Sequence, residues 1–517
     1  MIMRKFLFLS LICILVLSMA ACTSQPAGTT KTDSTAGTTT AVAAPAKDSV
    51  VVTILATPDS LDPMGTTMLY AQQVYKNING YLFEYNEKNE LVPSIAESYQ
   101  ANADSSVFTI KLKKGVLFHN GEELTAADVV YTMERGKAHP FQPQNFPLVD
   151  KAVALSDYEV EITLTSPYGS FLGILATPSF AILNEKATEE LGDKFARAPV
   201  GCGPYKYVSW TEGENIRLEA FDNYFRGKPS IKKATIKFIS DQNTALIGLE
   251  TGEIDYSYVF PESSKPDIKA NKDLTLFYYD STSFHFITLN HNVEALSNKK
   301  VRQAINLAIN REDVIAVALE GEGKVCHIPV NTNTFGYMEV KGYDLNVSEA
   351  KDLMNAAGYG NGFKIKLTAQ DAMTKKIAEV VAANLSEIGI TADIEVIETN
   401  TAVGNFMKGD YEMGVLAINN AQLDADFIKI LYVPDGSLNL ANYNNQELFN
   451  MFVEAGKLSD PDKRLNIYKQ IYDIMIDEAI YVPLFFPNRA HACSSNLNIT
   501  HVGGSSIAEI YNMSWKQ

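Results

Sequence analysis

The chain has 517 residues, of which 46% are hydrophobic and 20% are charged. This composition is typical of a globular protein and excludes a collagenous, disordered or disulfide-rich chain, and the length favours two or three lobes over a single core. Asp and Glu outnumber Lys and Arg by 61 to 44, and the resulting charge of −17 argues against nucleic acid as a partner, because an acidic surface repels phosphate.

The N-terminal segment predicts export from the cytoplasm. Arg4 and Lys5 precede an apolar run that has the pattern of a secretory signal and is short for a bilayer about 30 Å thick. The sequence Met19-Ala20-Ala21-Cys22 resembles a bacterial lipobox, although that motif usually begins with Leu. The resemblance implies that residues 1–21 are a lipoprotein signal peptide and that Cys22 carries a lipid. The alternatives are an uncleaved membrane anchor and a cleavage that leaves a free thiol.

Residues 23–49 are rich in Thr, Ala and Ser and contain only one larger aliphatic side chain, Val42. Such a stretch buries too little apolar area to offset its chain entropy. We therefore predict that 22–49 is a lipidated cysteine followed by a disordered linker, with a reach of about 30 Å. This places the folded part at the outer face of the bacterial cytoplasmic membrane, which is the periplasmic space in a Gram-negative cell.

Strand and helix patterns alternate along the rest of the chain, which predicts an α/β fold. Thr125 is expected to cap a helix together with Asp128, Asn310 to cap another, and Ser348 a third that ends at Gly358. Strands are predicted at 50–55, 108–112, 160–164, 365–367, 394–396 and 415–418, and helices at 126–133, 301–309, 311–318, 348–357 and 377–388.

Several short stretches resemble the extracytoplasmic solute-binding proteins of peptide and nickel ABC importers, the oligopeptide- and dipeptide-binding family also called solute-binding protein family 5. The resemblance covers nearly all of residues 50–517, and its strength lies in the order and spacing of many individually weak motifs. In one of them Cys202 replaces the usual Thr. The matching stretches are 59–63 (DSLDP), 91–99 (LVPSIAESY), 112–130 (LKKGVLFHNGEELTAADVV), 201–205 (GCGPY), 252–255 (GEID), 301–305 (VRQAI) and 356–359 (AAGY).

The resemblance implies a type II periplasmic-binding-protein clamshell, which has two α/β lobes and an inserted accessory domain. Lobe I would comprise 50–70, 200–285 and 488–517, and the accessory domain 71–199. Lobe II would comprise 286–487. The chain would then cross between lobes near 285 and 487, where extended sequence patterns occur.

The resemblance further implies a receptor that captures a small solute, expected to be a di- or oligopeptide, by hinge closure and hands it on to the transmembrane subunits of an ABC permease. No catalysis and no cofactor are expected. The expected form is a monomer, attached to the membrane through its N-terminal lipid.

The candidate ligand-binding segment is 417–427, which resembles the family pattern GWxxDxxDPxxF. In that pattern a carboxylate usually faces the α-ammonium of a peptide, and here Asn420 occupies its position. Either Asp424 or Asp426 takes over this role, or the ligand lacks a free amine; solvated loop carboxylates and an Asn-driven turn are the structural alternatives. The candidate ligand-binding residues are Asn419, Asn420, Gln422, Asp424 and Asp426.

Two other functions stay open at this point. A receptor of the same family could bind nickel or another non-peptide solute, and a lipid-anchored hydrolase could use two of the 61 acidic residues as a catalytic pair. The five cysteines have no CxxC spacing and the seven histidines are scattered, so we expect no metal site.

Overall fold

The computed structural model describes residues 47–139, 146–420, 423–434, 436–500 and 507–516. The part of the chain from Lys47 onward forms one compact unit. The predicted signal peptide, the lipidation site Cys22 and most of the linker lie outside the described residues, as does the candidate ligand residue Gln422. Within the described ranges, no helix combines the length and the apolarity needed to cross a bilayer.

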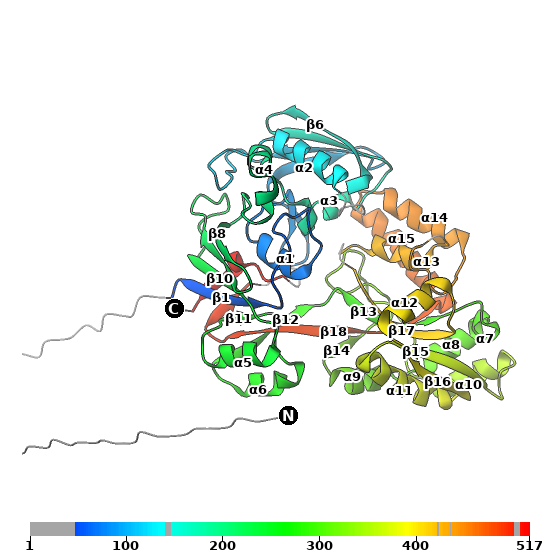
Figure 1. Cartoon of the computed structure of the whole chain (residues 1–517). Helices are drawn as coiled ribbons and strands as arrows, with labels where there is room; N and C mark the ends of the chain where they lie inside the picture. The colour runs from blue at the N-terminus through cyan, green and yellow to red at the C-terminus, as the bar shows by residue number, and fades with distance from the viewer. Residues whose placement is uncertain (1–46, 140–145, 421–422, 435, 501–506, 517) are drawn as a thin grey trace, which may run out of the picture. The chain divides into compact units, whose positions relative to one another are not determined.

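The described strands include a twelve-stranded mixed sheet, and the α/β prediction is confirmed. In spatial order the sheet contains β16 (Ile390–Val396), β15 (Phe363–Ala369), β17 (Met413–Asn419), β13 (Ser283–Leu289), β18 (Tyr481–Ser494), β11 (Tyr256–Ser257), β1 (Ser49–Ile54), β10 (Lys233–Phe238), β9 (Asn215–Ala220) and β8 (Tyr205–Thr211), while β12 (Leu274–Asp280) and β14 (Gly323–Val325) also pair with β18. Its centre is β18, the longest described strand, which runs as one continuous element from the β11 and β12 end of the sheet to the β13 and β17 end (Figure 1).

Two consecutive strands lie beside β18. Its N-terminal part pairs with β13, from Tyr481 opposite Thr288 to Phe485 opposite His285. Its C-terminal part pairs with β12, where Asn488 lies opposite Asp280. Because β12 and β13 are separated by only two residues, two antiparallel chain segments run from one part of the sheet to the other.

On one side of these segments, β15 pairs in parallel with both β16 and β17. Their aliphatic side chains form a core with the helices packed on the sheet. Asn310 caps its helix as predicted, but the N-cap of the next one is Asn346 and not Ser348, because the Asn346 side chain reaches the backbone N–H of Glu349 at 3.2 Å. The helices here are α7 (Glu294–Ser297), α8 (Lys299–Ala308), α9 (Arg311–Leu319), α10 (Val347–Ala356), α11 (Ala372–Ser386), α12 (Thr399–Lys408), α13 (Lys429–Tyr432), α14 (Gln446–Lys457) and α15 (Pro461–Glu478).

On the other side, β1 pairs in parallel with β10 and with β11. Val50, Val52 and Ile54 of β1 are buried in a second core, whereas Leu55 follows the strand and is 48% exposed. The continuous apolar and β-branched run from Val50 to Leu55 predicted this strand to within one residue at each end. The helices of this part are α1 (Leu69–Tyr75), α5 (Gln242–Glu250) and α6 (Lys265–Ala270), and a small sheet joins β19 (Leu497–Ile499) to β20 (Met513–Trp515).

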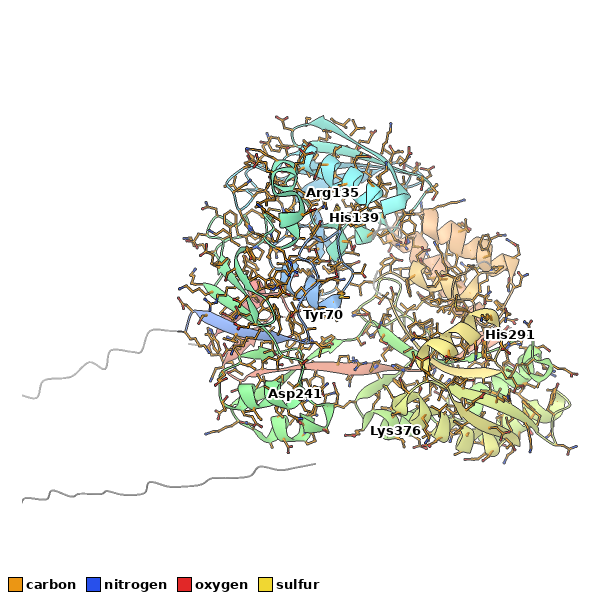
Figure 2. All side chains as sticks on the ribbon, in the orientation of Figure 1. Tyr70, Arg135, His139, Asp241, His291 and Lys376 are labelled. Carbon is orange, nitrogen blue, oxygen red and sulfur yellow. The ribbon has the colours of Figure 1, made fainter. Side chains whose placement is uncertain are left out.

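The chain between α1 and β8 contains a separate four-stranded antiparallel sheet with its own core. Thr125 and Asp128 form the predicted capping box of α2. From the same helix Arg135 reaches Asp62 of the motif at 59–63 with two hydrogen bonds of 3.1 and 2.5 Å (Figure 2 labels Arg135). The elements are β4 (Ala96–Ala101), β5 (Val107–Leu112), β7 (Glu159–Leu164) and β6 (Val149–Ser156), the pair β2 (Phe83–Tyr85) and β3 (Leu91–Pro93), and the helices α2 (Ala126–Ala138), α3 (Phe171–Ile174) and α4 (Glu185–Leu191).

Candidate functional site

The parallel strands β15, β16 and β17 end at the same edge of the sheet, which we call the carboxyl edge and define by Gln370, Asp371, Ile397, Glu398 and Asn419. In open α/β sheets, ligands bind in the crevice outside the carboxyl ends of such strands. Helix N-termini also open here. The carboxyl edge is therefore the candidate ligand site that the fold suggests in this half of the molecule.

Several polar groups of the carboxyl edge already have intramolecular partners. The Gln370 amide donates to the carbonyl of Val415 at 3.0 Å. Asp371 caps α11 by accepting from the N–H of Thr374 at 2.7 Å, and Glu398 caps α12 in the same way. Asn419 is exposed at the end of β17. Its side chain is therefore open to solvent, and its position fits the predicted ligand role.

Asn420 directly follows β17 but is buried, with 3% exposed. Its backbone N–H donates to the carbonyl of Thr282 at 2.9 Å, and its side-chain amide donates to the carbonyl of Asp424 at 3.1 Å. The second bond joins Asn420 to Asp424, and the first ties Asn420 to the chain before β13. The structure thus gives Asn420 a turn-closing role, while a role toward a ligand stays a prediction.

Asp424 lies in a buried ion pair. Its two carboxylate oxygens accept from the guanidinium of Arg464 on α15 at 2.6 and 2.9 Å, and both residues are less than a tenth exposed. One of these oxygens also accepts from the backbone N–H of Asp426 at 2.8 Å. Leu423, with a φ of +53°, turns the chain so that Asp424 faces inward.

Asp426 is 1% exposed and accepts from the ammonium of Lys429 at 2.8 Å. Burial raises the pKa of its carboxyl group, and the neighbouring Asp424 adds to this effect, whereas Lys429 opposes it. Asp424 and Asp426 are close to each other, and both carboxylates bind intramolecular cations. Their assignment to a ligand ammonium stays a prediction.

The same cluster contacts the chain segment between β7 and α3. The guanidinium of Arg464 donates to the hydroxyl of Ser170 at 2.7 Å, and the N–H of Gly169 donates to the carbonyl of Gly456 at 2.6 Å. The ammonium of Lys429 lies 5.3 Å from the ring centroid of Tyr168. The buried charges thus connect the antiparallel sheet of the insert to α14 and α15.

Two residues that the sequence did not suggest as ligand contacts lie on the crossing strands. His285 of β13 stacks on Phe485 of β18, with ring centroids 4.6 Å apart, and its Nδ1 is enclosed without a hydrogen-bond partner among the described residues. Burial, aided by the charge of Arg489, lowers the pKa of His285 to about 4, so that the ring is neutral at pH 7. Arg489 is half-buried on β18. No motif marks either residue, because their proximity depends on strand register.

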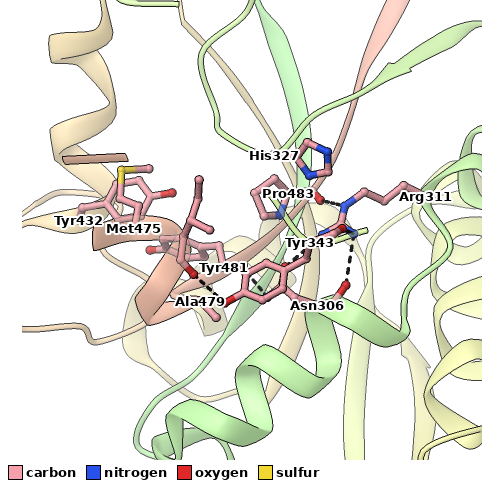
Figure 3. Close-up of a pocket in the computed structure, with 10 residues that line it drawn as sticks. Asn306, Arg311, His327, Tyr343, Tyr432, Met475, Ala479, Tyr481 and Pro483 are labelled. Atoms are coloured by element: carbon pink, nitrogen blue, oxygen red, sulfur yellow. Dashed lines mark hydrogen bonds between the residues drawn. The ribbon is translucent and has the colours of Figure 1, made fainter. Parts of the chain in front are cut away.

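A small cavity lies beside β18 near Arg311 (Figure 3). The buried Arg311 guanidinium donates to the carbonyls of Pro483, Asn306 and Tyr343 and to the side chain of Asn306. The cavity holds about 20 Å³, enough for one or two water molecules. It is therefore too small for a peptide. Within the described ranges, no three His, Cys, Asp or Glu side chains are grouped as a metal site.

Comparison with known proteins assigns the chain to a family. Residues 90–437 match the model of the bacterial extracellular solute-binding proteins, family 5. The glutathione-binding protein GsiB of Escherichia coli K12 is 28% identical over 468 residues, which cover 87% of this chain and 91% of GsiB.

Solved structures of bacterial binding proteins are also similar to this chain. The periplasmic binding protein DppA of Helicobacter pylori, solved in complex with the peptide STSA, is 26% identical with a TM-score of 0.70, over 91% of this chain and 99% of DppA. HbpA2 of Haemophilus parasuis reaches a TM-score of 0.84 at 22% identity, over 91% of this chain and 100% of HbpA2. The second likeness shows that the fold is shared.

Proposed function

The chain belongs to family 5 of the bacterial extracellular solute-binding proteins, which serve ABC importers, and we propose that it captures short peptides outside the cytoplasm and delivers them unaltered to a permease. Peptides are proposed because DppA of H. pylori binds one and because GsiB is named for glutathione, which is itself a tripeptide. The family match over 90–437 is the observation that carries this proposal.

The paired crossing strands support a mechanism of hinge closure. We propose that lobe I comprises 50–70, 200–285 and 488–517, the accessory domain 71–199 and lobe II 286–487. A rotation about the two-residue step between β12 and β13 and the facing part of β18 would bring the two lobes together on a ligand. Ligand contacts to both lobes would then favour the closed state.

The experiment is calorimetry and native mass spectrometry on the full chain in detergent, with glutathione and a mixture of short peptides. We expect saturable binding at micromolar affinity or tighter, which corresponds to about −8 kcal/mol or better. The bound compound should be recovered with unchanged mass. A chemically altered compound would instead support the lipid-anchored hydrolase, and binding of nickel or a nickel chelate without any peptide would support the non-peptide alternative.

We also propose that Cys22 is the lipidated N-terminus of the mature protein, on the basis of its position after a signal-like segment. Replacing it by Ser should move the protein from the membrane fraction to the soluble fraction and remove the added lipid mass. Cys13, inside the apolar segment, provides the matched control, and C13S should leave both properties unchanged. Retention of the C22S protein in the membrane would support the uncleaved anchor.

A further inference from the structure

The arginines of this acidic protein differ in whether an acidic partner neutralises them. Among the eight arginines that the structure describes, five contact a carboxylate, and the buried Arg311 contacts carbonyl and amide oxygens. Only two, Arg217 and Arg489, have neither an ion pair nor a side-chain hydrogen bond within the described residues. The five pairs with carboxylates are Arg135–Asp62, Arg197–Glu212, Arg226–Glu84, Arg302–Glu478 and Arg464–Asp424.

The two unpaired arginines lie in different environments. Arg217 is exposed on β9, where water solvates its guanidinium. Arg489 is half-buried on β18, in the stretch where the two crossing segments pair, and lies opposite Tyr279 in the register. A partly desolvated guanidinium without an anion is costly, and acidic partners are abundant in a chain with a charge of −17. The missing partner of Arg489 therefore needs an explanation.

The strand register shows which side chains lie on the same face of the sheet as Arg489. Alternate residues of a strand point to the same side, so Arg489 lies on the same side of β18 as Phe485. His285 stacks on Phe485 and pairs in register with Ala417, which is exposed near the end of β17. Asn419, two residues further on, is on the same side and reaches the carboxyl edge. The unpaired guanidinium, the His285 ring and the Asn419 side chain thus lie on one side of the sheet.

Among the side chains that the structure describes, no carboxylate forms an ion pair with Arg489. Asp371, at the carboxyl edge, has its carboxylate bound by the N–H and the hydroxyl of Thr374 at 2.7 and 2.8 Å. His285 is neutral at pH 7, since its pKa is lowered to about 4 by burial, and it adds no charge of either sign. Arg489 therefore offers one planar guanidinium without a described ion-pair partner, and such a group matches the two oxygens of a carboxylate.

We propose that Arg489, flanked by His285 at the crossing strands, binds a carboxylate of the transported solute. This inference rests on the proposed function and specifies it: the solute is an anion at this end, as is a peptide with a free C-terminus. The protein would then recognise a peptide by the carboxyl end of that peptide at the crossing strands. An unpaired Asp side chain in the 417–427 segment of the protein would not be required.

The test uses the full chain in detergent with three variants, R489Q, R489K and R217Q. The probes are glutathione and two matched tripeptide mixtures, one with free C-termini and one with C-terminal amides, and the affinities are measured by calorimetry. R217Q is the control, because it removes the same charge at the other unpaired arginine. Circular dichroism shows whether each variant is folded, and R489K keeps the charge should R489Q be unstable.

We expect wild type and R217Q to bind the free acids at least about tenfold more tightly than the amides, as a charge-assisted bidentate pair requires. R489Q should lose about tenfold in affinity for the acids and lose the preference, with R489K in between. Undiminished acid preference in R489Q overturns the inference and leaves the solute-binding function intact, as does equal binding of acids and amides by wild type. If wild type binds none of the probes, the proposed peptide function fails, and the inference fails with it.

Discussion

Replacement of Asp424 by Asn tests whether this carboxylate is a structural element or a ligand contact. The side chains of Asp424 and Arg464 are only 10% and 5% exposed, and two hydrogen bonds of 2.6 and 2.9 Å join them. D424N leaves the buried guanidinium facing a neutral amide. Breaking a buried ion pair in this way costs about 3–5 kcal/mol of unfolding free energy.

The assay is urea unfolding followed by circular dichroism, with the midpoint and slope compared between variants. D222N is the matched control: Asp222 pairs with Lys228 at 3.0 Å on the surface, where solvent screens the charges, so its midpoint should stay unchanged. The double variant D424L/R464M, which removes both charges, should recover part of the loss. The reasoning is refuted if D424N unfolds at the wild-type urea concentration while binding of the peptide probes disappears, because Asp424 would then contact the ligand.

Two further changes probe packing and protonation. G169A should destabilise the protein by at least about 1–3 kcal/mol in the same urea assay, because the added Cβ would lie 1.7 Å from the carbonyl oxygen of Leu458. G404A, in a helix with free space around the glycine, should instead stabilise it by about 0.5–1 kcal/mol. Equal effects of the two substitutions would contradict the observed contact. Burial lowers the pKa of His119 to about 4, and its Nδ1 accepts from the N–H of Gly201. Between pH 6.5 and 4 the unfolded chain therefore binds a proton at this histidine more readily than the folded chain does. The free energy of unfolding consequently falls as the pH falls. From pH 7 to 5 this histidine should account for roughly 2 kcal/mol of the loss in unfolding free energy. Urea unfolding of H119N at the two pH values should therefore show a smaller change in unfolding free energy than wild type shows. An identical change in both proteins would refute the assignment.

Local sequence patterns determined most of the elements of this fold. Alternating apolar residues predicted the strands at 108–112 and 160–164, and the capping box at Thr125 was recognisable from its spacing alone. These features depend on residues within four positions of each other. The N-cap at Asn346 was missed, because Ser348 and Asn346 are both good caps and the choice between them depends on which side chain reaches a free N–H.

The candidate site shows what local sequence patterns could not predict. The sequence located the segment 417–427, but the partners of its carboxylates come from far along the chain, and Arg464 is 40 residues from Asp424. The sequence could not show that α15 places a guanidinium there, nor that Ser170 of the insert contacts the same guanidinium. Polar residues of this segment therefore looked available to a ligand until the helices were in place.

The amino-acid sequence by itself determined the fold class, the family and the predicted export signal, because these are written in local patterns and in the order of motifs. Only the tertiary structure decided which charges are neutralised. Whether a carboxylate or a guanidinium keeps its charge free for a solute depends on the groups that burial brings beside it. In this chain, register alone brings His285 and Arg489 to the same pair of crossing strands, from positions 204 residues apart.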